Sequence, residues 1–331
     1  MKRALVLGGG GAKGAFELGA LQYIRDMQPA FFNFQIIAGV SVGSLNGVML
    51  AQNKFRELEN IWNEITDEKV YTGHMPKGIF QYFGLALKVL FGRRSILGVG
   101  PLTSLVKQHV DIAHVQVDFR CGFVSLITGE YIPCRHTQFG MDNDNFQKAI
   151  LGSSSMPIIW PPVEQVKIGE KLYKDVVDGG VRNLSPLKDV ILDDPDEIVI
   201  INSNAQNLAE DPGAGKNIFR IADRSLQDIA MNEIFRGDIE EFIKTNEIVR
   251  QCKEKGIPVY RDKEQKEQYE YFNSIIIEPA VGLGNPLDFS TQRITQIREA
   301  GWKAAEAAFA QYEPARGFAT VRSYKSVGVK R

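Results

Sequence analysis

The chain is short of cysteine and of net charge, and both shortages exclude classes of protein. Its 331 residues include three cysteines (Cys121, Cys134 and Cys252), an odd number with no C-x-x-C spacing. That argues against a disulfide framework or a zinc site and indicates a reducing compartment. The net charge of −1 gives no electrostatic reason to expect nucleic acid as a partner. No group of side chains has metal-ligand spacing, so we expect neither a metal nor a cofactor.

The chain also lacks a long hydrophobic run. Met1-Lys2-Arg3 and the apolar residues 4–7 superficially resemble the start of a signal peptide, but the run ends at Gly8. A signal peptide needs roughly 7–15 apolar residues, and a membrane-spanning helix needs about 18. We therefore expect a cytoplasmic protein, and the sequence leaves peripheral contact with a membrane surface open.

Two successive strand–loop–helix units open the chain. Residues 4–7 (ALVL) predict a short buried strand, and apolar residues at helical spacing predict a helix that runs to about Gln28. Residues 34–38 predict the second strand and residues 44–52 the next helix. This alternation indicates an α/β fold with a parallel sheet covered by helices. Further strands are predicted at 115–126, 131–133, 176–178, 198–202 and 274–279, and further helical regions at 55–110, 146–151, 218–270 and 290–311.

The glycine loop between the first strand and its helix has more than one interpretation. Residues 9–14 (GGGAKG) match G-x-G-x-x-G, which is also the fingerprint of dinucleotide-binding folds. Those folds place an acidic residue at the end of the second strand, whereas here Ala38-Gly39 and then a serine follow. The bare N–H groups of the loop would equally stabilise an oxyanion at the helix N-terminus. A tight turn that serves packing alone is the third interpretation.

A serine motif follows the second strand. Residues 39–43 (GVSVG) match the G-x-S-x-G nucleophile elbow, and they lie between a buried strand and a helix, as that motif requires. Gly39 and Gly43 leave room for a strained turn that projects the hydroxyl of Ser41. The positive end of the following helix favours negative charge that develops beside it. The motif in this context predicts that Ser41 is a nucleophile.

A nucleophilic serine needs a base, and the chain is poor in histidine. It has four, namely His74, His109, His114 and His136, and none lies after residue 136. A triad in the order serine, Asp178, histidine is therefore impossible. Either an upstream histidine acts in an unusual order, or a carboxylate acts directly.

Asp178 is the best carboxylate candidate. It ends the predicted strand 176–178 and precedes Gly179 and Gly180. We expect it at the end of a strand in a parallel sheet, where active sites collect. Burial beside the serine would raise its basicity and suit it to accept the hydroxyl proton. An ordinary Asp-Gly turn is the alternative interpretation.

Two further segments carry weaker signals. Residues 79–91 (IFQYFGLALKVLF) would cover an acyl channel or touch a membrane surface, although a plain core helix is favoured. Residues 212–217 (PGAGKN) resemble the end of a phosphate-binding loop. They lack its first glycine and its terminal Ser/Thr, so a surface loop is predicted.

Taken in order, residues 9–14, 39–43 and 178–180 resemble the three motifs of the patatin-like phospholipase family. Residues 149–163 (AILGSSSMPIIWPPV) also resemble the block of serines and prolines between its elbow and its aspartate. The resemblance implies a patatin-like three-layer α/β/α fold with a mostly parallel central sheet. The resemblance covers a catalytic core at 4–205 and does not extend beyond it. The residue pattern predicts a mostly helical part of the same or a closely packed domain at 206–312, and a basic, frayed tail at 313–331.

The resemblance also implies roles for the motif residues. Ser41 would be the nucleophile and Asp178 the base of a Ser–Asp dyad without histidine. The backbone of Gly9, Gly10 and Gly11 would form the oxyanion hole. The remaining motif residues are Lys13, Gly14, Gly39, Gly43, Gly179 and Gly180.

The implied function is hydrolysis of acyl esters of phospholipids or other lipids through an acyl-enzyme. A nucleotide-binding oxidoreductase and a non-catalytic lipid-binding module on the same fold are the alternatives. The sequence sets neither the head group nor the oligomeric state.

Overall fold

The structure is a computed structural model that describes residues 1–75, 92–205, 208, 210–262, 264, 267–312 and 320–323. The apolar segment 79–91 lies outside the described residues. Among the helices within these ranges, none combines the length and the apolar character that crossing a membrane requires.

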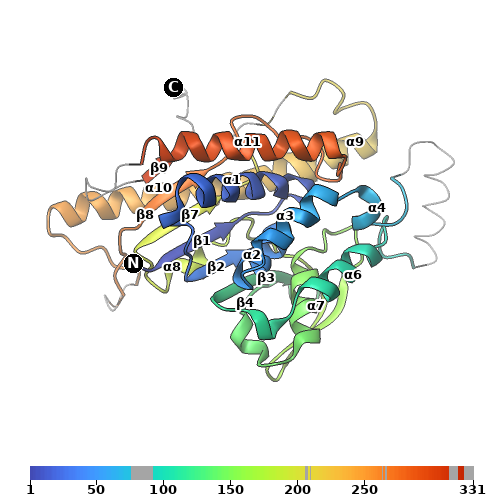
Figure 1. Cartoon of the computed structure of the whole chain (residues 1–331), viewed down its shortest axis with the longest axis horizontal. Helices are drawn as coiled ribbons and strands as arrows, with labels where there is room; N and C mark the ends of the chain where they lie inside the picture. The colour runs from blue at the N-terminus through green and yellow to red at the C-terminus, as the bar shows by residue number, and fades with distance from the viewer. Residues whose placement is uncertain are drawn as a thin grey trace.

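A mixed, mostly parallel sheet runs through the described part of the chain (Figure 1). Its strands are β1 (Arg3–Leu7), β2 (Ile36–Gly39), β3 (Asp118–Ser125), β4 (Tyr131–Arg135), β5 (Val163–Ile168), β6 (Lys171–Asp178), β7 (Glu197–Ile201), β8 (Asn273–Ile277) and β9 (Thr320–Arg322). The strand order is β5-β6-β3-β2-β1-β7-β8-β9, with β4 paired to β3 beside this path. Pairing is parallel from β3 through β2, β1, β7 and β8 to β9, whereas β4, β5 and β6 pair antiparallel.

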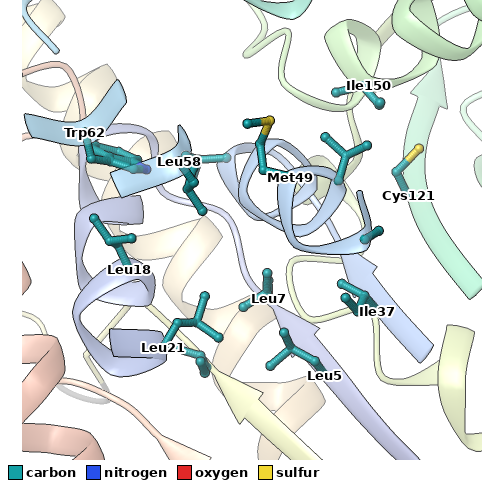
Figure 2. Close-up of a cluster of buried hydrophobic side chains, with 14 of the residues drawn as sticks. Leu5, Leu7, Leu18, Leu21, Ile37, Met49, Leu58, Trp62, Cys121 and Ile150 are labelled. Carbon is teal, nitrogen blue, oxygen red and sulfur yellow. The ribbon is translucent and has the colours of Figure 1, made fainter. Parts of the chain in front are cut away.

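Helices cover both faces of this sheet, as the alternation of side chains along β1 requires. The helices are α1 (Gly14–Met27), α2 (Val42–Ala51), α3 (Phe55–Glu64), α4 (Asp67–Val70), α6 (Gly100–His109), α7 (Asn143–Ser153), α8 (Lys188–Ile191), α9 (Ile218–Ala222), α10 (Met231–Glu254) and α11 (Thr291–Phe309), with a π-helical segment at Asp223–Ala230. Leu5 and Leu7 belong to the larger core, with side chains of α1, α2 and α3 (Figure 2). Ala4 and Val6 lie on the other face, in a smaller core with Ile239 of α10. The result is the expected three-layer α/β/α arrangement.

The C-terminal part of the chain extends the same sheet. Strand β8 pairs with β7, β9 pairs with β8, and α11 lies along α1 (Figure 1). The expectation of a frayed tail is therefore wrong for residues 320–322. These residues form β9, because pairing with residues 274–276 satisfies their backbone groups.

Two glycines bring α1 and α11 into backbone contact. A Cβ atom at Gly19 would overlap the carbonyl oxygen of Arg298, and one at Gly301 would overlap the carbonyl oxygen of Phe16. Only glycine fits where one helix backbone lies directly on another. Helix α1, which precedes the elbow in the sequence, is thereby held directly against α11.

Replacement of Gly19 by alanine should destabilise the protein by about 1–3 kcal/mol, because the new methyl group forces α11 away from α1. Gly237 in α10 is the matched control, since nothing lies within 4 Å of the Cβ that it would acquire. Gly237→Ala should be neutral or stabilising by up to about 1 kcal/mol. Urea unfolding followed by circular dichroism measures both, and equal midpoints for the two variants would contradict the close contact.

Candidate active site

The pairing of β3 brings Ser41 and Asp178 to one place. Cys121 pairs with both β4 and Gly39 of β2, and Phe123 pairs with both β4 and Asp178 of β6. Because a strand has two edges, β2 and β6 must share the edge of β3 that β4 leaves open. One is parallel to β3 and the other antiparallel, so they run toward each other. They end at Gly39 and Asp178, opposite β3 residues that are two positions apart.

This geometry corrects one expectation. The sequence predicted that Asp178 ends a strand in the parallel part of the sheet. Strand β6 is antiparallel to β3 and reaches the site from the opposite direction. The carboxylate still arrives beside the elbow, because the two strand ends face each other along one edge.

Ser41 has the strained backbone of a nucleophile elbow. Its φ is 57° and its ψ is −132°, and α2 begins at the next residue. A Cβ at Gly39 would overlap the carbonyl oxygen of Gly43, and a Cβ at Gly43 would overlap that of Gly8. The two motif glycines are therefore required by close packing of the turn, and the surrounding structure holds Ser41 in a conformation that disfavours a side chain.

The segment 153–155 holds both partners. The N–H of Ser41 donates to the carbonyl oxygen of Ser153 (3.0 Å), and the N–H of Asp178 donates to that of Ser155 (2.9 Å). The hydroxyls of Ser44 (2.7 Å) and Ser154 (3.1 Å) donate to the carbonyl oxygen of Ser41. Sequence patterns alone missed these contacts, and only the family resemblance of residues 149–163 marked the segment.

The Asp178 carboxyl is buried against the Ser41 hydroxyl. Burial raises its pKa from 3.8 to about 7, and hydrogen bonds from the Ser41 side chain and the Gly180 N–H partly oppose that rise. The Gly180 N–H lies 2.8 Å from Oδ1 of Asp178. Gly179 must be glycine, since a Cβ there would overlap the carbonyl oxygen of Gly122. The arrangement places a carboxyl that titrates near neutral pH next to a hydroxyl.

The glycine loop lies against the side chain of Ser41. A Cβ at Gly9 would be 2.8 Å from Cβ of Ser41, and the φ angles of Gly10 and Gly11 are 153° and 58°. Within the described part of the chain, no group accepts a hydrogen bond from the N–H of Gly9, Gly10 or Gly11. Unpaired amides beside a hydroxyl are suited to bind an anion.

The other two residues of the glycine motif have contacts of their own. Nζ of Lys13 lies 3.2 Å from Oδ1 of Asn204, in the segment after β7. A Cβ at Gly14 would overlap the side chain of Val42, so Gly14 lets α1 approach the start of α2. Lys13 thus connects the loop to the segment after β7, and Gly14 allows the close packing of α1 on α2.

No histidine hydrogen bonds to Ser41 among the described residues, although His109 lines the same pocket as Ser41. His109, His114 and His136 contact Glu57, Asp111 and the backbone of Phe119, and His74 is exposed. The described ranges include all four histidines of the chain, and none of their ring nitrogens hydrogen bonds with Ser41 or Asp178 in them. The carboxyl of Asp178 is therefore the titratable group in contact with the hydroxyl.

An apolar pocket adjoins the site. Its empty space amounts to about 750 Å³, the open mouth included, and Gly11 and Ser41 are part of its lining. Most of the wall consists of apolar side chains of α2, α3 and α6, with Trp160 and Phe289. The cavity therefore presents a mainly apolar wall next to the Ser41 side chain.

The three-layer fold and the serine at a tight strand–turn–helix junction place the protein among α/β proteins with a G-x-S-x-G turn after a strand of the sheet. The model of the patatin-like phospholipase family matches residues 5–191, more than half of the chain, and the chain belongs to that family. The crystal structure of VipD from Legionella pneumophila is similar over 93% of this chain, with 12% identity and a TM-score of 0.46. The chain covers 66% of the VipD chain, less than two thirds. No curated protein sequence matches it.

Proposed function

We propose that the protein is a lipid acyl hydrolase in which Ser41 is the nucleophile and Asp178 the base. One observation carries the proposal: the Ser41 hydroxyl, on a strained elbow, is hydrogen-bonded to a buried carboxyl whose pKa is about 7. A base with a pKa near the working pH transfers protons efficiently. Membership of the patatin-like phospholipase family supports the same reaction class.

The mechanism has two half-reactions. Oδ2 or Oδ1 of Asp178 takes the proton of Ser41 as Oγ attacks the ester carbonyl, which becomes a tetrahedral oxyanion. The N–H groups of Gly9 to Gly11 stabilise that oxyanion. The C–O bond to the alcohol breaks, and Asp178 returns the proton to the leaving oxygen. Water then loses a proton to Asp178 and attacks the acyl carbonyl. The bond between the acyl carbon and Oγ breaks, Asp178 returns the proton to Oγ of Ser41, and the fatty acid leaves.

The pocket supports a fatty acyl chain as the group bound next to Ser41. Most of its lining is apolar, and each methylene of the substrate that these side chains bury contributes about 0.8 kcal/mol. We place the acyl chain between α2, α3 and α6. The head group would then lie at the open mouth.

A series of p-nitrophenyl esters tests this function. Purified protein should hydrolyse them, with kcat/KM rising with acyl length, and it should release fatty acid from phosphatidylcholine vesicles. Val106, a buried pocket residue of α6, is the site for a blocking variant. Val106→Phe should lower kcat/KM for a decanoyl ester by about 50-fold, because about three methylenes of the acyl chain would no longer be buried. The same variant should leave kcat/KM for the acetyl ester within about twofold of the wild-type value. Equal losses on both esters would contradict the placement of the chain.

The alternative functions lack a supporting observation. A dinucleotide-binding fold places an acidic residue at the end of its second strand, whereas β2 ends at Gly39. A non-catalytic lipid-binding module would bind vesicles without releasing acyl groups, so the same assay separates it from a hydrolase.

We also propose residues 4–205 as the catalytic core, with residues 206–312 packed on it as a supporting part. Peripheral contact with a lipid surface follows from the proposed substrate. A cytoplasmic location follows from the cysteine content of the sequence.

A further inference from the structure

We propose that Ser203 and Asn204 are positioning residues, which orient the peptide between Gly9 and Gly10 so that the Gly10 N–H faces the reacting carbonyl. The proposal rests on the function proposed above. Both residues follow β7 and lie outside residues 5–191, the part that the family model matches. The segment after β7, which none of the three motifs includes, would then contribute to catalysis by orienting the oxyanion hole.

Both side chains donate to one carbonyl oxygen. The Ser203 hydroxyl lies 2.6 Å from the carbonyl oxygen of Gly9, and Nδ2 of Asn204 lies 3.2 Å from it. Because a trans peptide is planar, its N–H and C=O point in opposite directions. Two donors that hold the Gly9 carbonyl on their side therefore direct the Gly10 N–H away from them, and Gly9 lies directly against Ser41.

The peptide between Gly10 and Gly11 is also held by a hydrogen bond to its carbonyl oxygen. The carbonyl oxygen of Gly10 accepts a hydrogen bond from the N–H of Lys13 (3.1 Å), within the turn that starts α1. That bond fixes the Gly11 N–H on the opposite side of its own peptide. The local sequence thus orients the second peptide, whereas the first depends on residues from a distant strand.

The segment that carries the two donors is itself hydrogen-bonded to the sheet. Asn202 accepts from the Asn204 N–H (2.9 Å) and donates to the Asn204 carbonyl oxygen (2.6 Å). The Asn202 N–H donates to the carbonyl oxygen of Ile277 in β8 (2.9 Å), and Ser203 is fully buried. The position of the donors is therefore set by the sheet and not by a free loop.

Glycine at position 10 makes this support necessary. A Cβ at Gly10 would overlap the Ser203 hydroxyl, so the close contact exists only because position 10 has no side chain. A glycine peptide has little intrinsic preference between orientations. Without the two donors, the Gly9–Gly10 peptide would be free to rotate and the oxyanion would lose an aligned partner.

Ser203→Ala, Asn204→Ala and the double variant test the proposal with a p-nitrophenyl ester and a trifluoromethyl ketone, which forms a tetrahedral adduct with a serine nucleophile. Ser203→Ala should lower kcat by about 10-fold and the double variant by about 100-fold, with KM within about twofold. The inhibition constant of the ketone should rise by the same factors, because both quantities depend on the oxyanion contact.

Ser274→Ala is the matched control. Ser274 is fully buried in β8 and its hydroxyl donates to a backbone carbonyl, that of Phe272 (3.0 Å), away from the glycine loop. It should lose similar thermal stability and keep kcat and the inhibition constant. Wild-type values of both quantities in Ser203→Ala and Asn204→Ala would overturn the proposal. An inactive wild-type protein would instead refute the proposed function itself.

Discussion

Asp178→Asn should abolish hydrolysis and at the same time raise the stability of the protein at pH 8. Loss of the base should lower kcat/KM by about 10²- to 10⁴-fold. Asparagine keeps an oxygen for the Gly180 N–H and offers an N–H to Ser41, so the hydrogen bonds at this position are retained. What disappears is the buried negative charge.

The sign of the stability effect follows from the pKa. Burial raises the pKa of Asp178 from 3.8 to about 7, so the folded state binds the proton more tightly than the unfolded state. The stability that this group contributes is fully present below about pH 4 and is lost as the pH rises to about 7. A difference of about three in pKa corresponds to roughly 4 kcal/mol at pH 8. Asp178→Asn removes that cost.

Thermal unfolding of the wild-type protein and Asp178→Asn between pH 4 and pH 8 measures this effect. The variant should unfold at a higher temperature at pH 8, and the two curves should converge near pH 4. In the wild-type protein, log kcat/KM should rise with slope one up to about pH 7 and then level off, because only the ionised carboxylate accepts the proton. A pH-independent stability difference, or activity retained by the variant, would contradict the assignment.

Ser41→Ala and Ser41→Gly should both be inactive and should differ in stability. Neither has a hydroxyl, so turnover of any acyl ester should fall to background. Ser41 has φ 57° and ψ −132°, a conformation in which a Cβ costs about 1–3 kcal/mol. Glycine relieves that strain, which outweighs the roughly 0.4–1 kcal/mol that it gains in unfolded-state entropy.

Differential scanning calorimetry compares the two variants directly. Ser41→Gly should unfold at a higher temperature than Ser41→Ala, although both lack the same hydroxyl. The reverse order would mean that the elbow carries no strain. Residual activity in either variant would mean that another group is the nucleophile.

The local motifs of the site could be predicted from the sequence because each has a local steric cause. The elbow needs Gly39 and Gly43, since their neighbours leave no room for a Cβ, and those neighbours lie within the first two strand–loop–helix units. Four early elements were likewise predicted, because apolar residues at strand and helix spacing fall on buried faces of β1, α1, β2 and α2.

The remaining parts of the site depend on contacts between distant segments. The antiparallel direction of β6 follows from its pairing with β3, which no local pattern near Asp178 encodes. The carbonyl oxygens of Ser153 and Ser155 hold the elbow and the aspartate, yet backbone acceptors leave no trace in the sequence. Ser203, after β7, contacts Gly9, after the neighbouring strand β1, and strand β9 pairs with the edge of β8.

Fluorophosphonate labelling followed by peptide mass spectrometry tests the central claim most directly, since it reports both the nucleophile and its activation. At pH 8 the wild-type protein should carry one adduct, on Ser41, formed at a rate that falls by at least about 100-fold in Asp178→Asn and is unchanged in His109→Ala. An adduct on another residue, or labelling that depends on His109 and not on Asp178, would contradict a dyad of Ser41 and Asp178.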